Sequence, residues 1–390
     1  MAMTGLYIHV PFCRKKCHYC NFVIAPAGSD AGHRVFLDVL EKEVKHWAPR
    51  FLGTVFDTVY LGGGTPSTLR AGEFERLFRI LKTHFFWKKE AELTCEVNPG
   101  DVDLDRAFLL KGFGINRISL GAQTFHDGTL QRLNRAHNAG EIESSFRALR
   151  DAGFKNISMD LMLSLPGESW ELAHASLERA AALGPEHISL YELTLEEKTV
   201  FGRMHHEGKL ELPGEEEQFE MLSKARLFLQ EAGYRHYELL NYAKPGFESR
   251  HNLLYWANED YLGLGPGATS YFDGRRFKNS DSYEQYQEKI VRDDWSAQEE
   301  EALDEQKKET ESFLLALRLT EGADAGRFRS MLERRKDEID SLCEKGLLSV
   351  EDDKVRLSSR GQFMAETVFT ELSSPAHPRL PPGPIAVASR

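Results

Sequence analysis

The stretch Cys13-Arg14-Lys15-Lys16-Cys17-His18-Tyr19-Cys20 places three cysteines within eight residues. Thiolates are the ligands that iron–sulfur clusters prefer, and basic neighbours lower thiol pKa values and offset cluster charge. The spacing therefore predicts one soft inorganic centre, and a four-iron cluster held by three cysteines has one iron open for a ligand. The alternatives are three unrelated buried cysteines, or a zinc ion with His18 as fourth ligand, although His18 lies inside the loop and is a poor closing ligand.

Composition sets broad limits on the class of protein. With 390 residues, 41% of them hydrophobic, the chain can bury a large core in one α/β barrel or in two or three domains. A formal net charge of −12 argues against a large nucleic-acid footprint, so small molecules or protein partners are expected. No apolar run is long enough to span a bilayer, no signal peptide is expected, and three of the five cysteines are clustered. We expect a cytoplasmic protein. A peripheral contact with a membrane is compatible with this location.

Short β-type runs alternate with amphipathic helical segments in the first half of the chain. Strands are expected at 7–10, 58–61, 93–97, 117–120, 158–163 and 187–193. Helical patterns lie between them, at 35–47, 73–84, 127–133, 142–152 and 171–182. This alternation predicts βαβ units around a parallel sheet, and six units predict a partial (β/α)6 barrel of the α/β class. Its active site is expected at the carboxyl ends of the strands.

Polar and glycine-rich chemistry recurs where these strands end. The cysteine loop follows the first strand, and Gly62-Gly63-Gly64-Thr65-Pro66 follows the second. Glu96-Val97-Asn98-Pro99 ends the third strand, Gln123 follows the fourth, and Asp160 lies in the fifth. One shared site explains the recurrence, since parallel strands bring these ends together. Taken singly, the glycine run is also a tight strand-to-helix turn, and each polar residue is also an ordinary turn residue.

The second half of the chain has a different pattern. A helix is expected at 215–232, a strand at 234–242, a loop-rich segment at 244–272, and a helix followed by a linker at 281–308. From 309 to 373, helical patterns precede a hairpin turn at Glu351-Asp352-Asp353-Lys354, which predicts a winged-helix-like module. Between Lys307 and Arg360 there are twelve basic and twelve acidic residues, so a docking or lid role is favoured over DNA reading.

The expected domains follow from these patterns. They are a barrel core at 1–200, a barrel extension and linker at 201–300, the winged-helix-like module at 301–373, and a tail at 374–390. The tail holds five prolines, and disorder is expected for it. The remaining cysteines, Cys95 and Cys343, are isolated and are expected to be buried and unreactive.

Several motifs together resemble a known family. They are Tyr-Ile-His-Val-Pro-Phe-Cys at 7–13, the glycine run, Glu96-x-Asn98-Pro99, Gln123 with Arg135 and His137, and Asp160 with Leu165-Pro166-Gly167. The cysteine spacing resembles the radical S-adenosylmethionine (radical SAM) superfamily. The whole set is similar to the group containing oxygen-independent coproporphyrinogen III oxidase and the HemW-type haem chaperones. The likeness covers about residues 4 to 370.

That resemblance implies a set of cofactors and ligands. It implies a 4Fe-4S cluster on Cys13, Cys17 and Cys20, with S-adenosylmethionine on the open iron, in a TIM-like radical SAM barrel. Residues around S-adenosylmethionine are then Tyr7 and Tyr19 at its border, Gly63, Gly64, Thr65 and Glu96 at its methionine end, Arg135 at its carboxylate, and Gln123 and Asp160 at its ribose.

Two features separate the relatives within that group. The oxidases typically have a fourth cysteine two residues after the third, where this chain has Phe22, and an extension before the barrel, where this sequence begins close to the first strand. His251-Asn252-Leu253-Leu254-Tyr255-Trp256 is similar to the H-N-x-x-Y-W signature of the haem chaperones. Histidine can ligate haem iron, and Tyr255 and Trp256 offer flat faces for a porphyrin. The alternative is an asparagine-stabilised turn with an aromatic anchor on the barrel.

The resemblance thus favours a haem chaperone that binds haem and passes it to an acceptor haem protein, for which a respiratory protein is a candidate. An electron donor such as flavodoxin or ferredoxin is expected, and nucleic acid is not. The first alternative is oxidative decarboxylation of coproporphyrinogen III to protoporphyrinogen IX, an activity that is not expected here. The second is a haem- or redox-responsive regulator acting through the C-terminal module. Whether the chain is an enzyme is left open, and no catalytic residue is assigned.

Overall fold

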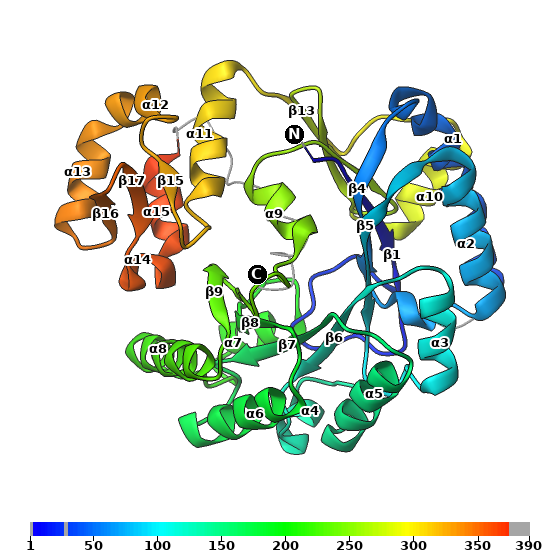
Figure 1. The fold of residues 1–390 in the computed structure, drawn as a ribbon. Helices are drawn as coiled ribbons and strands as arrows, with labels where there is room; N and C mark the ends of the chain where they lie inside the picture. The colour runs from blue at the N-terminus through cyan, green and yellow to red at the C-terminus, as the bar shows by residue number, and fades with distance from the viewer. Residues whose placement is uncertain (1–2, 27–29, 374–390) are drawn as a thin grey trace.

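The computed structural model describes residues 3–26 and 30–373, so the proline-rich tail lies outside the described residues. One curved sheet of twelve strands runs through this described part, in the order β14-β13-β12-β11-β1-β4-β5-β6-β7-β8-β10-β9 (Figure 1). Six neighbouring strands are parallel: β1 (Gly5–Val10), β4 (Val55–Gly63), β5 (Phe86–Val97), β6 (Arg117–Gln123), β7 (Ile157–Leu163) and β8 (His187–Glu192). These are the six strands that the sequence predicted, and the α/β class and partial (β/α)6 barrel are confirmed.

Helices cover the outer face of this sheet (Figure 1). They are α1 (Asp30–Trp47), α2 (Ala71–His84), α3 (Leu104–Gly112), α4 (Asp127–Arg132), α5 (Ala139–Asp151) and α6 (Trp170–Leu183). The strands are buried on both faces, as expected for parallel strands under helices. Sequence reasoning missed α3, although Asp103 before it is a strong N-cap residue whose side chain accepts a hydrogen bond from the Arg106 backbone N–H.

Beyond β8 the chain extends the sheet at both edges. After α7 (Val200–His206) and α8 (Glu215–Glu231), the strand expected at 234–242 is a pair, β9 (Arg235–Glu238) and β10 (Asn241–Ala243), with β10 antiparallel to β8. The other edge consists of β11 (Tyr261–Leu264), β12 (Thr269–Phe272), β13 (Arg275–Lys278) and β14 (Glu299–Ala302). On the β1 side, the sheet is therefore continued by β11, a strand from the second half of the chain that pairs with β1.

The expectation of a loop-rich segment at 244–272 is wrong, because α9 (Arg250–Trp256), β11 and β12 lie there. The helix expected after residue 281 is α10 (Tyr283–Val291), but the predicted linker contains β14. Glycines in and after β11 interrupt the alternating pattern by which strands are predicted from sequence. At Gly263 a Cβ would lie 2.1 Å from the Thr269 carbonyl oxygen, so the glycine that weakens the strand signal is what lets β11 and β12 approach.

The C-terminal residues form a separate hydrophobic cluster around buried Phe313, Met331 and Val355. Its elements are α11 (Glu305–Ala316), β15 (Ala323–Asp324), α12 (Arg329–Arg334), α13 (Lys336–Glu344), β16 (Leu348–Glu351), β17 (Lys354–Leu357), α14 (Ser359–Phe363) and α15 (Ala365–Leu372). The hairpin turn occurs where it was expected, with positive φ at Asp352 and Asp353. Classification of the module as winged-helix-like, and the domain boundaries, stay predictions.

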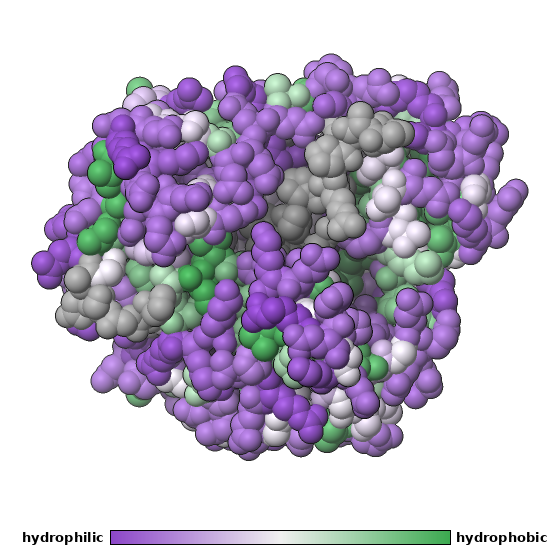
Figure 2. Space-filling model, turned by 180° about the vertical axis from the view of Figure 1, so that it is seen from behind, coloured by the Kyte–Doolittle hydropathy of each residue, from purple (hydrophilic) through white to green (hydrophobic). Residues whose placement is uncertain are grey.

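The face of the molecule in Figure 2 is largely hydrophilic where it is coloured. On the face in Figure 2, hydrophobic residues are scattered in small groups among hydrophilic ones. Across residues 3–26 and 30–373, no helix combines the length and the apolarity needed to cross a membrane.

Candidate cofactor site

A pocket of about 150 Å³ lies at the carboxyl ends of the parallel strands. The predicted residues that line it are Cys13, Cys17, Tyr19, Cys20, Gly63, Gly64, Thr65, Glu96, Gln123, Arg135, Asp160 and Asn252. Most come from the loop after β1, from the ends of β4, β5 and β6, and from within β7. Arg135 belongs to the loop between α4 and α5, and Asn252 belongs to α9. The fold thus brings together motifs that are far apart in the sequence.

Backbone contacts hold the cysteine loop over the pocket. Cys13 ends β2 (Phe12–Cys13), which pairs with β3 (Ala25–Pro26), and the Cys20 N–H donates to the Cys17 carbonyl oxygen at 3.2 Å. The His18 ring contacts the Arg132 carbonyl oxygen at 2.9 Å, so it is held by the connection after α4. His18 is therefore turned to the backbone and not toward the three thiols.

The three half-buried thiols line the pocket without closing on one point. In the part of the chain that the structure describes, no group of three or more histidine, cysteine, aspartate or glutamate side chains is arranged to hold a metal ion. Three thiols from one loop lining one pocket match the three-cysteine ligand set expected for an iron–sulfur cluster.

Burial dominates the charge state of the Cys13 and Cys20 thiols. It raises the pKa of Cys13 to about 11, against the lowering effect of the Thr65 hydroxyl, and that of Cys20 to about 12. Lys16 lowers the pKa of Cys20, as expected of a basic neighbour, but in the ligand-free protein burial outweighs this effect. One physical reason is that Arg14 turns away from the loop and pairs with Asp101 at 2.7 Å.

The glycine run allows an approach that no other residue permits. At Gly64 a Cβ would lie 2.7 Å from the Phe12 carbonyl oxygen. Gly63 has φ of +104°, and a Cβ there would lie 2.6 Å from the His9 ring. The short 3-10 helix η2 (Pro66–Thr68) follows, so the run is also the tight turn that its sequence suggested. The structural and ligand-binding interpretations are compatible.

Glu96 faces the end of the glycine run. Its Oε2 accepts the Gly63 N–H at 3.1 Å, and its Oε1 accepts the Tyr60 hydroxyl at 2.9 Å. Burial, reinforced by the nearby Asp160 carboxyl, raises the pKa of Glu96 to about 8. In the ligand-free pocket this carboxyl is therefore largely protonated at neutral pH, and a cationic ligand group would favour its ionised form.

A chain of polar contacts joins two of the cysteines through the pocket wall. Cys13 Sγ contacts Thr65 Oγ1 at 3.4 Å, and Thr65 Oγ1 accepts the Asn98 amide at 2.7 Å. Arg135 donates through Nη2 to Asn98 Oδ1 at 2.5 Å and through Nη1 to Cys17 Sγ at 3.4 Å. The Nε of Arg135 is buried without a hydrogen-bond partner, so this guanidinium has donor capacity left for a ligand.

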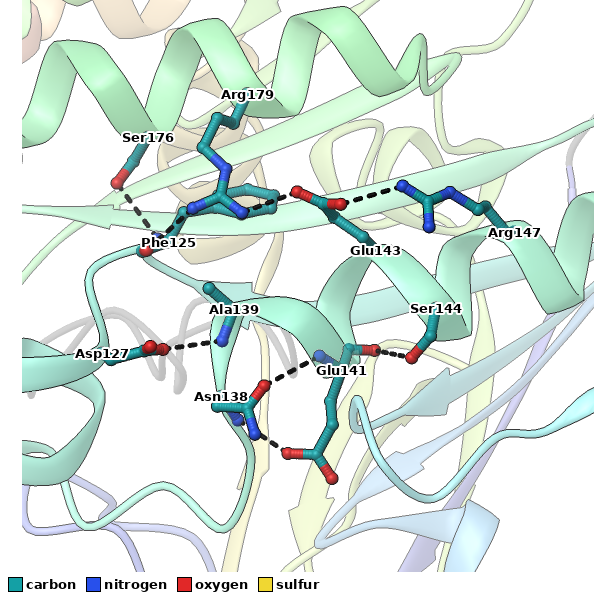
Figure 3. Close-up of polar contacts among 10 residues, drawn as sticks. All are labelled: Phe125, Asp127, Asn138, Ala139, Glu141, Glu143, Ser144, Arg147, Ser176 and Arg179. Atoms are coloured by element: carbon teal, nitrogen blue, oxygen red, sulfur yellow. Dashed lines mark hydrogen bonds and ion pairs between the residues drawn. The ribbon is translucent and has the colours of Figure 1, made fainter.

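The loop that carries Arg135 is fixed by the start of α5 (Figure 3). Asn138 and Glu141 form a capping box, with side-chain to backbone distances of 3.0 and 2.9 Å. Asp127 Oδ1 accepts the Ala139 N–H at 2.8 Å (Figure 3). These bonds anchor the far end of the loop that carries Arg135 over the pocket.

Gln123 and Asp160 lie on neighbouring strands. Gln123 ends β6 with φ of +67°, an uncommon conformation for a non-glycine residue that often marks functional sites. Both carboxyl oxygens of Asp160 accept the Ser119 hydroxyl at 3.0 Å, and Ser158 adds a contact at 3.3 Å. Burial raises the pKa of Asp160.

The two predicted tyrosines differ in position. Tyr19 lines the pocket beside the cysteines. Tyr7 does not line it. Its ring lies 6.0 Å from that of Tyr60, and its hydroxyl contacts His9 Nδ1 at 3.3 Å. In this structure Tyr7 supports the pocket wall from behind.

The H-N-x-x-Y-W segment is α9, which packs against the beginning of β4 inside the barrel (Figure 1). His251 is fully buried, and its Nδ1 and Nε2 contact Thr58 Oγ1 and the Tyr255 hydroxyl, both at 2.6 Å. Burial lowers the pKa of His251 to about 3. Tyr255 and Trp256 are buried as well, and Asn252 alone of the four reaches the pocket. Because each ring nitrogen is engaged, His251 can ligate a haem iron only if at least one of these contacts breaks.

Sequence reasoning missed several pocket residues. They are Tyr60, Arg117, Ser119, Ser189 and Tyr191. A usable signal existed, because side chains two residues apart on a strand face the same side. Arg117 and Ser119 precede Gly121 and Gln123 at this spacing on β6, and Ser189 precedes Tyr191 on β8. Polar residues at alternate positions of otherwise apolar buried strands indicate a polar barrel interior.

The donor set fits the expected cofactors. Three thiols suit an iron–sulfur cluster, while Glu96, Asp160 and the unpartnered Arg135 Nε suit the amino, hydroxyl and carboxylate groups of a nucleoside-linked amino acid. Glycine at position 64 leaves the backbone open beside them.

Comparison with known proteins agrees with this site. Residues 7–180 match the radical SAM superfamily. The whole fold resembles coproporphyrinogen III oxidase (HemN) from Escherichia coli, described as a radical SAM enzyme, with a TM-score of 0.84 at 23% identity, covering 95% of this chain and 90% of the other. Fold and site define a radical SAM protein.

Relatives narrow the assignment further. Heme chaperone HemW of Bacillus subtilis is 34% identical over 376 residues, covering 94% of this chain and 98% of that relative. Heme chaperone HemW of Lactococcus lactis is 33% identical over 372 residues, covering 94% and 96%. The chain belongs to the HemW family.

Proposed function

We propose that this protein is a haem chaperone that binds haem and transfers it to an acceptor haem protein. We further propose that it carries a 4Fe-4S cluster with exchangeable S-adenosylmethionine. The observation that carries the proposal is full-length similarity to proteins named haem chaperones, together with three thiols lining one pocket. Phe22 also lines that pocket, at the position where the oxidase relatives typically have a fourth cysteine.

We assign the cofactor contacts as follows. Cys13, Cys17 and Cys20 hold the cluster. The methionine end of S-adenosylmethionine is held by Gly63, Gly64, Thr65 and Glu96, and Arg135 binds the carboxylate of that end. The ribose is bound by Gln123 and Asp160. Tyr19 borders the cofactor, and Tyr7 supports the pocket wall from behind. When reduced, the cluster would supply the electron that cleaves a carbon–sulfur bond of the sulfonium. The chain of contacts from Cys13 through Thr65, Asn98 and Arg135 to Cys17 supports one joint site.

We keep His251, Asn252, Tyr255 and Trp256 as the proposed haem segment, with a condition that the geometry imposes. Haem ligation by His251 requires that Tyr255 or Thr58 release a ring nitrogen, because both nitrogens are engaged. A neutral imidazole is the ligand form for iron, and burial favours it here.

The test is anaerobic reconstitution followed by haem titration and by transfer to a haem-depleted acceptor. We expect stoichiometric haem uptake and restored acceptor activity. His251→Ala should weaken uptake, and unchanged affinity would remove His251 from the haem site while leaving the chaperone proposal intact. Failure of the wild type to bind or transfer haem would overturn the proposal.

Coproporphyrinogen III oxidation is the second candidate, favoured by the fold likeness alone. Incubating the reconstituted, reduced protein with coproporphyrinogen III should give no protoporphyrinogen IX. Turnover would show that the protein is an oxidase and not solely a chaperone.

The partners and location are proposed on the same basis. We propose a haem protein, such as a respiratory one, as acceptor, and flavodoxin or ferredoxin as electron donor. A cytoplasmic location, with at most peripheral membrane contact, fits the composition. A DNA-reading role is disfavoured, since α13 of the C-terminal module carries Asp337, Glu338, Asp340 and Glu344.

A further inference from the structure

Arg117 occupies the interior of the barrel below the proposed S-adenosylmethionine contacts. It begins β6, lines the pocket and is 2% exposed. Ser119 and Gly121 follow at alternate positions on the same strand and also line the pocket, so all three face inward. A guanidinium stays charged in proteins, which makes its burial here a feature that needs an explanation.

The strands on either side of β6 supply two carboxyl groups. Ser119 is the register partner of Glu96 on β5 and of Ser158 on β7, and Asp160 follows Ser158 on the same face. Arg117 therefore lies two residues before Ser119 on the same inward face of β6. This strand runs between the strands that carry the two acidic residues. One buried cation is placed against two buried acids.

Neither acid is bonded to this cation. The Glu96 oxygens accept from Tyr60 and Gly63, and those of Asp160 accept from Ser119 and Ser158. The Nε of Arg117 is buried without a hydrogen-bond partner. The guanidinium thus acts on the acids through space and not by fixing their geometry.

Glu92 on β5 faces the same side, two residues before Thr94, the register partner of Arg117, and its oxygens accept the Arg250 and His251 backbone N–H groups. The remaining titratable groups around Arg117 are neutral. They are Tyr60 on β4, His187 and Tyr191 on β8, Tyr237 on β9, and His251 on α9. His187 contacts Ser158 at 2.8 Å and Tyr237 at 2.9 Å, and burial lowers its pKa well below the usual range. Neither imidazole can replace the positive charge, and Arg135 is committed to the cysteine loop and Asn98.

We propose that Arg117 is a positioning residue that supplies the positive charge allowing Glu96 and Asp160 to be ionised together when they bind the amino and ribose groups of S-adenosylmethionine. This inference rests on the proposed function, since it takes those two contacts from it. Arg117 acts through the carboxylates and does not itself need to touch the cofactor.

The electrostatics of the ligand-free pocket point the same way. The pKa of Glu96 is about 8, raised mainly by burial and also by Asp160, whereas Arg117 lowers it. Burial also raises the pKa of Asp160, and Arg117 is again among the groups that lower it. Removing the cation should raise both pKa values, and each unit corresponds to about a tenfold change in the ionised population.

The test compares S-adenosylmethionine affinity across pH in the reconstituted full-length protein. The variants are Arg117→Met, which keeps the bulk, Arg117→Lys, which keeps the charge, and Arg226→Met as a control. Arg226 lies on α8 outside the pocket, is partly buried, and also has an unpartnered Nε. Iron and sulfide content and circular dichroism check that the variants fold and load.

The readout is the ratio of variant to wild-type dissociation constants between pH 6.5 and 9.5. Ionisation of the ligand itself cancels in this ratio. For Arg117→Met we expect about a tenfold ratio at pH 7 that falls toward one as pH rises, because both acids then ionise without help. The dissociation constant of Arg117→Lys should stay within about threefold of the wild-type value, and that of Arg226→Met should equal the wild-type value.

A weakened affinity whose ratio does not change with pH would assign Arg117 a merely structural role and overturn the inference. A ratio of one at every pH would overturn it as well. If Arg117→Met does not fold, Arg117→Gln is compared with Arg117→Lys by the same criterion. A wild-type protein that binds no S-adenosylmethionine would instead overturn the cofactor assignment under the proposed function.

Discussion

The Arg135 Nη1 lies 3.4 Å from Cys17 Sγ, although 118 residues separate the two in the sequence. The same guanidinium donates to Asn98, whose amide reaches Thr65 beside Cys13. A cation therefore lies against the cysteine loop before any cluster charge is present. Arg135 therefore supplies a positive charge against Cys17, whereas Arg14 is paired with Asp101.

Replacing Arg135 with glutamine should weaken S-adenosylmethionine binding about 10- to 100-fold, because a bidentate cation for a carboxylate is lost. Cluster content should fall less, since all three thiols remain. Equilibrium binding and iron analysis of the reconstituted protein would measure both. Arg147→Gln is the matched control, because Arg147 forms only an exposed pair with Glu143 on α5. Equal affinity of the Arg135 variant and the control would contradict the assignment.

Gly64→Ala should abolish cofactor loading, because the new Cβ would collide with the backbone of Pro11 and Phe12 at 2.7–2.9 Å. The expected loss of stability is about 1–3 kcal/mol, measured by denaturant unfolding. Gly72→Ala on α2 is the control. It has nothing within 4 Å and should stabilise the protein by about 0.5–1 kcal/mol. A Gly64→Ala protein that loads cluster and S-adenosylmethionine normally would refute the close-approach argument.

Stability of the ligand-free protein should decrease as pH rises through the range where Glu96 ionises. The pKa of Glu96 is about 8 when folded against an ordinary value of 4.5, so the folded state binds the extra proton in this window. The contribution is fully present below about pH 4.5 and is lost as pH passes 8. Glu96→Gln should remove this part of the slope between pH 5 and 9, as followed by urea unfolding. A variant with the wild-type slope would show that Glu96 ionises normally.

His251 and Tyr255 give a test of haem ligation that separates it from folding. Tyr255→Phe keeps the flat ring but leaves His251 Nε2 unpaired, and should reduce the free energy of unfolding by about 1–3 kcal/mol. If Nε2 is the atom that ligates haem, this variant should bind haem more tightly than wild type, because one competing contact is gone. His251→Ala should be similarly destabilised but should bind haem more weakly. Weaker haem binding by both variants would indicate that α9 contributes only structurally.

Thr58→Val provides the reciprocal check on the same helix. It removes the Nδ1 contact of His251 at 2.6 Å with little change in volume. We expect destabilisation of about 1–3 kcal/mol by denaturant unfolding, since a buried imidazole nitrogen is left unpaired. S-adenosylmethionine affinity should stay within about threefold of wild type, because Thr58 lies near the start of β4, far from the glycine run at its end. A large loss of affinity would show that α9 is coupled to the cofactor pocket.

The local patterns of the sequence were sufficient for the barrel and for the three thiols of the pocket. Six short apolar runs separated by amphipathic helices indicate parallel strands without any knowledge of which strand pairs with which. Three cysteines in one loop stay close together in any fold. The same holds for the glycine run, whose turn is a local backbone property. These features depend on residues that are neighbours in the chain.

Only the tertiary structure decided which side chains meet. Arg117 lies between Glu96 and Asp160 because β6 pairs with β5 and β7, and β11 reaches β1 from more than 250 residues away. Likewise His251 is buried because α9 packs against the start of β4, where the Thr58 hydroxyl contacts the His251 ring Nδ1. Periodicity reports which face of a strand is buried but not which residue lies opposite, and charge and hydrogen-bond partners are set by that opposition.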